Sequence, residues 1–194
     1  MRTPRSGYVL GLRGWYLAQA PAPPPPGSRT SVGLVSILEY SCRWPKGEPL
    51  VASCMRVPAL ARWAEPSHAS PPRLADPEHC LCGIWAASDL VGILRHWPVQ
   101  GIVYGYVAIW GRVRTAWGPE GEREWRGEFA YPQAILAPSY VDALAEAHGI
   151  ERQPFPSRLL WPRFSLEEEI LASVVHDYGV PIVAEPVWQP GVRC

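Results

Sequence analysis

Alternation of small and large side chains marks the clearest element of the chain, a two-stranded ribbon over residues 101–132. Successive residues of a β-strand point to opposite faces, so residues 101–114 divide into two sets. One set is small or β-branched: Val103, Gly105, Val107, Ile109, Gly111 and Val113. The other set holds the aromatic and basic residues: Ile102, Tyr104, Tyr106, Ala108, Trp110, Arg112 and Arg114. The first set is typical of a packed core.

The return strand of the ribbon is predicted over residues 124–132, after a turn that contains Gly118, Pro119 and Gly121. Its apolar positions are Trp125, Gly127, Phe129 and Tyr131, and they alternate with Arg126 and Glu128. The pattern leaves the register open. A slip of one residue decides whether Arg112 lies across from Gly127 and is free, or across from Glu128 and is neutralised.

Three helices are predicted from apolar spacing and end signals. Ser88 or Asp89 can cap the first, whose apolar residues Leu90, Ile93, Leu94 and Trp97 recur at helical spacing. Ser139 is the expected cap of the second, over residues 139–148, which Gly149 ends. Ser165 and Glu168 form a capping box for the third, which ends before Gly179. Its expected buried face is Ile170, Leu171, Val174, Val175 and Tyr178.

Shorter strands are expected at residues 7–20, 31–40 and 50–55, with a tight turn joining the last two into a pair. Residues 181–187 contain two prolines, so a strand there would lie at an edge. These elements predict an α+β fold, a small curved antiparallel sheet or partial barrel with three main helices.

One domain is expected over residues 1–194 because the chain has the length and apolar content of a single globular core. Within it, residues 20–29 predict a proline-rich loop and residues 57–78 a long irregular loop. Residues 139–194 would then form a C-terminal helical extension.

Charge limits the classes of partner. Basic and acidic residues number 18 each, so no general field attracts a polyanion, and nucleic-acid binding would need a local patch. The N-terminal segment lacks the unbroken apolar stretch of a signal peptide, and no segment reaches the ~20 apolar residues of a membrane span. We therefore expect a cytoplasmic protein without a membrane partner.

Cysteine and histidine offer three readings. Cys54, His68, Cys80 and Cys82, with His79 beside the cysteine pair, have the chemistry of a structural zinc site. They also fit buried free thiols. Alternatively, Cys80 or Cys82 is a catalytic nucleophile ahead of a helix N-terminus. The phosphate-binding, dinucleotide-binding and common hydrolase motifs are absent from the sequence.

Three motifs occur in order along the chain: Cys-Leu-Cys-Gly-Ile-Trp-Ala at residues 80–86, the strand at 103–113 with Trp-Gly-Arg-Val, and Trp-Arg-Gly-Glu-Phe-Ala-Tyr-Pro at 125–132. Together they resemble a family of small uncharacterised bacterial proteins with Cys-x-Cys-Gly-Ile-Tyr-Ala, Trp-Gly-x-Val and Arg-x-Glu-x-Ala-Tyr-Pro motifs. Trp85 stands where that family usually has tyrosine. The resemblance carries no activity and implies only that the cysteines and the ribbon belong to one module.

These observations favour a non-catalytic binding module for a planar or anionic ligand, with a nucleic-acid base or end as one form. Aromatic rings stack on planar groups, and arginine holds phosphate or carboxylate. The candidate ligand-binding residues are Tyr104, Tyr106, Trp110, Arg112, Arg114 and Arg126. Burial of both ribbon faces would remove this site. The alternatives are a cysteine-dependent enzyme and a protein-protein interaction subunit, with or without structural zinc.

Overall fold

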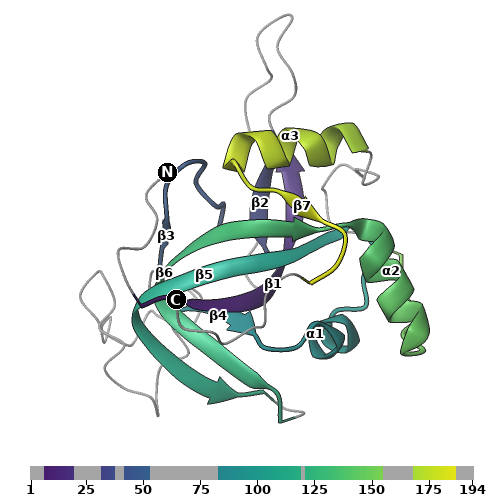
Figure 1. The fold of residues 1–194 in the computed structure, drawn as a ribbon, viewed down its shortest axis with the longest axis horizontal. Helices are drawn as coiled ribbons and strands as arrows, with labels where there is room; N and C mark the ends of the chain where they lie inside the picture. The colour runs from purple at the N-terminus through teal and green to yellow at the C-terminus, as the bar shows by residue number, and fades with distance from the viewer. Residues whose placement is uncertain are drawn as a thin grey trace, which may run out of the picture.

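The computed structural model describes residues 7–19, 32–37, 42–52, 83–118, 121–154 and 168–186. These parts of the chain form an α+β fold of one mixed sheet and three helices (Figure 1). The strands are β1 (Val9–Gln19), β2 (Val32–Ser36), β3 (Leu50–Val51), β4 (Ile84–Ala87), β5 (Ile102–Trp117), β6 (Arg123–Leu136) and β7 (Ile182–Val183). The helices are α1 (Leu90–His96), α2 (Pro138–Ala147) and α3 (Glu168–Tyr178). None of these helices has the length and apolar character that crossing a membrane requires.

The sheet closes on itself through four of its strands. β5 pairs with β1 on one side and β6 on the other, and β4 also pairs with both β1 and β6. The ring of β1, β5, β6 and β4 is not a regular barrel. β2 extends the sheet beyond β1, while β3 and β7 pair with β6. The predicted curved sheet or partial barrel is confirmed, except that β7 pairs in parallel.

The ribbon of β5 and β6 is confirmed as the longest pairing, and two irregularities bend it. At the second, Trp110 lies opposite Phe129 but Val113 lies opposite Gly127, so β5 has one extra residue. Gly111 takes φ 80° there, a left-handed conformation that glycine adopts without strain. Figure 1 shows the distal half of the ribbon turning away from α3 beyond this bend.

Capping residues and glycines in the sequence predict most of the helix ends correctly. Asp89 caps α1, accepting hydrogen bonds from the Val91 N–H at 3.1 Å and the Gly92 N–H at 2.8 Å. The cap predicted for α2 is wrong: Ala137 precedes that helix, and Pro138, whose fixed φ suits a first turn, begins it. Gly149 and Gly179 both take φ 64° just after α2 and α3, as predicted for residues that end helices.

Tyr178 ties α3 to the β2 side of the sheet. Its hydroxyl donates to the Trp44 carbonyl at 2.8 Å and accepts from the Leu34 N–H at 2.9 Å. Burial raises the pKa of this phenol to about 12. Leu171 and Val174 are buried beside it, and Ile170 and Val175 are partly buried, which confirms the predicted face of the helix.

The predicted pairing of residues 31–40 with 50–55 is wrong. β2 pairs with β1 and β3 with β6, at opposite ends of the sheet. The segment after β2 folds back on β2 itself, because the Trp44 N–H donates to the Leu34 carbonyl at 2.9 Å. The residues predicted as the proline-rich loop (20–29), the long loop (57–78) and the capping residue Ser165 lie outside the described residues.

Arg13 is a buried cation in the middle of β1. It is 3 % exposed, donates to the Trp85 carbonyl and to Ser36 Oγ at 2.6 Å, and lies 5.3 Å from the Trp44 ring centroid. Burial lowers the pKa of its guanidinium to about 10, although Cys42 opposes the shift. Through the Trp85 carbonyl, Arg13 fixes β4 against β1.

Candidate binding surface beside helix α1

The inner half of β5 is buried on both faces. Tyr104 and Tyr106 are 1 % and 0 % exposed and pack with residues of α1 and α2. The Tyr104 hydroxyl donates to the Trp97 carbonyl at 3.0 Å, and burial raises the pKa of this phenol. Neither ring is placed to stack on a ligand, so the predicted row of exposed aromatics is corrected at these two positions. The helices that cover them are the physical reason.

Trp110 is also part of the packing. Its ring is stacked on Phe129 with the centroids 6.0 Å apart and the planes at 22°, and it lies against the main core cluster. The bend at Gly111 separates it from the arginines that follow. Thus the three aromatic residues predicted to bind a ligand do not share a surface with Arg112 and Arg114.

Glu128 neutralises Arg112, which is the second of the two outcomes that the sequence left open for the register. The Glu128 carboxylate accepts from Arg112 Nε at 2.5 Å and from the Arg112 main-chain N–H at 3.0 Å, and the two side chains form an ion pair. Burial raises the pKa of the Glu128 carboxyl, but these hydrogen bonds and the guanidinium charge lower it below its ordinary value. The Arg112 guanidinium is therefore already engaged by an acid.

Arg114 and Arg126 lie directly opposite each other across β5 and β6, and Arg126 also lies opposite Trp85 of β4. Opposite residues in neighbouring strands share a face, so Trp85, Arg126 and Arg114 form a row across three strands. Both arginines are partly exposed. The next row on this face is Ala87, Glu124 and Ala116. We call this face, together with the adjoining side of α1, the α1-side surface.

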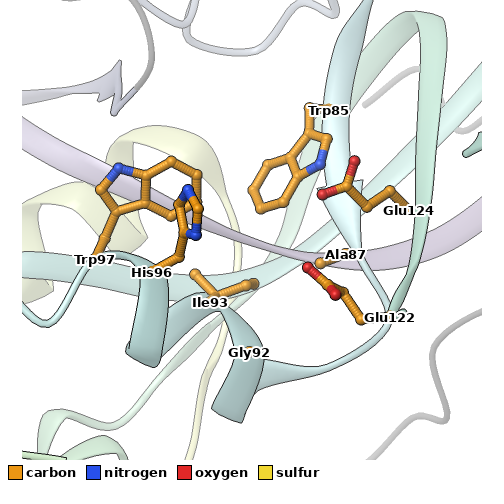
Figure 2. A pocket seen from close by; sticks show the side chains of 8 residues that line it. All are labelled: Trp85, Ala87, Gly92, Ile93, His96, Trp97, Glu122 and Glu124. Atoms are coloured by element: carbon orange, nitrogen blue, oxygen red, sulfur yellow. The ribbon is translucent and has the colours of Figure 1, made fainter. Parts of the chain in front are cut away.

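A small pocket opens on the α1-side surface between β4, β6 and α1 (Figure 2). Trp85 and Trp97 form its aromatic walls, with ring centroids 5.6 Å apart and planes at 69°. The His96 ring lies 4.5 Å from the Trp97 ring. The carboxylates of Glu122 and Glu124 lie across the pocket from Trp97 and His96 (Figure 2). The free space of the pocket is about 30 Å³. This volume suits a small polar head group rather than a large organic molecule.

Trp85, Trp97 and Glu124 are functional candidates that sequence reasoning did not select. Trp97 was predicted as one of the apolar residues of α1. Trp85 was noted only because the resembling family usually has tyrosine at that position. Glu124, Arg126 and Glu128 stand at every second position of β6, and this polar alternation is the sequence signal that could have identified Glu124.

The cysteine and histidine candidates Cys54, His68, His79, Cys80 and Cys82 lie outside the described residues. Within the ranges that the structure describes, no three His, Cys, Asp or Glu side chains are grouped to hold a metal ion. Comparison of the chain with models of protein families, with curated proteins and with solved structures gives no match.

Proposed function

We propose that this chain is a non-catalytic binding module for a planar ligand with a phosphate or carboxylate group. The ligand's anionic group would contact Arg114 and Arg126 on the α1-side surface. The observation that carries the proposal is the direct cross-strand opposition of these two arginines beside Trp85. Two guanidinium groups side by side repel each other, and a shared anion turns that repulsion into attraction.

Geometry supports a shared anion. Opposite residues in an antiparallel pair have Cβ atoms about 4.5–5.5 Å apart, so both guanidinium groups can reach one phosphate or carboxylate. Arginine presents its donors as a planar fork that matches such oxygens in pairs. Trp85 adjoins the pair in the same row, and its small exposed part, 6 % of the residue, offers the planar part of the ligand an apolar contact.

Fewer residues contact the proposed ligand than the sequence predicts. Tyr104, Tyr106 and Trp110 are no longer ligand contacts, since they pack in the interior or against Phe129. Arg112 is held by Glu128. The proposed anion contacts are Arg114 and Arg126, on the ground of their cross-strand opposition. A mononucleotide or the phosphate-bearing end of a nucleic acid has the required chemistry.

The test is a calorimetric titration with adenosine 5′-monophosphate, inorganic phosphate and a short single-stranded oligonucleotide. The Arg114→Ala/Arg126→Ala variant should lose affinity by at least about tenfold, because charge-assisted hydrogen bonds are removed. The matched control is Arg43→Ala/Arg123→Ala, which removes the same charge from two exposed positions. Equal loss in both variants, or binding that survives in the first, would overturn the proposal. The urea midpoint of each variant checks that it is folded.

A further inference from the structure

The second candidate site centres on Glu124 of β6, whose side chain lines the pocket. Its residue is 9 % exposed, and its carboxylate is directed into the pocket beside Trp85 (Figure 2). Within the described residues, the Glu124 side chain makes no hydrogen bond or ion pair. A mostly buried carboxylate favours a cation or hydrogen-bond donors as neighbours. The Glu124 oxygens are not among the enclosed side-chain atoms that lack a partner, so they open onto the pocket, where a cation can reach them.

The walls of the pocket favour a cation. Indole rings carry negative charge density on their faces and attract ammonium groups, most strongly among the aromatic side chains. Trp85 and Trp97 meet nearly edge to face, and both line the pocket. Glu122 adds a second carboxylate at the rim. Aromatic walls with carboxylates are the chemistry that recognises organic ammonium ions.

A metal ion fits the same pocket less well. Calcium and magnesium require about six or more oxygen ligands, which two carboxylates and two indoles do not supply. No set of three metal-ligating side chains occurs among the described residues. An alkylammonium group instead needs one or two acceptors for its N–H groups and an apolar wall for its carbon atoms.

We infer that the pocket between Trp85, Trp97 and Glu124 binds a small alkylammonium group, such as the head of a lysine side chain or of a free amine. The ammonium N–H groups donate to Glu124, and the attached carbon packs on the two indoles. The free space of about 30 Å³ limits the group to a head of a few heavy atoms. This site stands independently of the anion contact at Arg114 and Arg126.

The test uses the full chain labelled with nitrogen-15 and titrated with methylammonium chloride, with sodium chloride at equal ionic strength as the reference. Indole N–H signals of Trp85 and Trp97, assigned with Trp→Phe variants, should shift and saturate only with methylammonium. Glu124→Gln should weaken binding by about tenfold, since the isosteric amide removes the charge. Glu146→Gln, at an exposed position of α2, is the charge-matched control and should bind as the unchanged protein does.

The inference is overturned if methylammonium causes no saturable shift beyond that of sodium chloride, or if Glu124→Gln binds unchanged. Should Glu124→Gln fail to fold, Trp97→Leu serves instead, because it removes a partly exposed indole and keeps the carboxylate. Retained affinity in that folded variant also overturns the inference. A parallel titration with inorganic phosphate separates the two sites, since loss of phosphate binding alone affects only the proposed function.

Discussion

The carboxylate of Glu128 holds Arg112 through both its side chain and its main chain, with Nε at 2.5 Å and the backbone nitrogen at 3.0 Å. This contact exists because the extra residue at Gly111 turns the Arg112 backbone N–H toward β6. The contact changes the charge of the candidate binding surface. It neutralises Arg112, whereas the proposed anion contact uses the opposed pair Arg114 and Arg126.

The stability that the Arg112–Glu128 pair confers should decrease at acid pH. The pKa of Glu128 is lowered in the folded chain, so its contribution is present above the unfolded pKa and is lost as pH falls through the folded pKa. Glu128→Gln should cost about 0.5–1 kcal/mol at neutral pH, since the Arg112 side chain is half exposed, and less at pH 3, which lies below the unfolded pKa of about 4.3. Urea unfolding at both pH values measures this. An equal cost at both would show that the charge is not involved.

The bend at Gly111 should tolerate no side chain. A Cβ atom there would lie 2.8 Å from Phe129 Cδ2 and from Glu128 Oε2, and φ is 80°. Gly111→Ala should therefore lower the free energy of unfolding by about 2–3 kcal/mol, through backbone strain and contact together. Gly121→Ala is the matched control: its φ is 82°, but no atom lies within 4 Å of an added Cβ. Its cost should be about 1 kcal/mol, from strain alone. Similar costs for both would contradict the role of close contact.

The Tyr178 phenol should make the fold sensitive to alkali. Its pKa is raised by burial to about 12, against about 10 in an unfolded chain. The stability it contributes is thus fully present below pH 10 and is lost as pH rises toward 12. Tyr178→Phe should cost about 1–3 kcal/mol at neutral pH, because the Leu34 N–H and the Trp44 carbonyl lose their partner. Its unfolding free energy should then fall less steeply between pH 10 and 12. An unchanged slope would contradict this account.

The sequence predicted elements whose signals are local. Asp89 and the apolar residues of α1 are close in the chain, and so are Gly179 and the end of α3. The partners of β2 and β3 were missed because Tyr178, more than 130 residues from Trp44, helps to place the intervening segment.

The candidate site was predicted only in part for a related reason. Strict alternation placed Tyr104, Tyr106 and Trp110 in line with the arginines, but the extra residue at Gly111 breaks that alternation. Burial of the two tyrosines depends on α1 and α2 packing over β5, which no spacing within the ribbon shows. Arg114 was selected because it alternates in line with the aromatic residues, and Arg126 because it alternates with the apolar residues of the return strand. Their direct opposition became visible only with the register.

The most direct measurement of the central claim is a map of amide chemical-shift changes on addition of adenosine 5′-monophosphate. Saturable shifts are expected at Arg114, Arg126 and Trp85, which adjoin one another across three strands. Arg43, beside β2 at the far side of the sheet, should not respond. Saturable shifts centred elsewhere, or none at all, would contradict the proposal that this surface binds a planar anion.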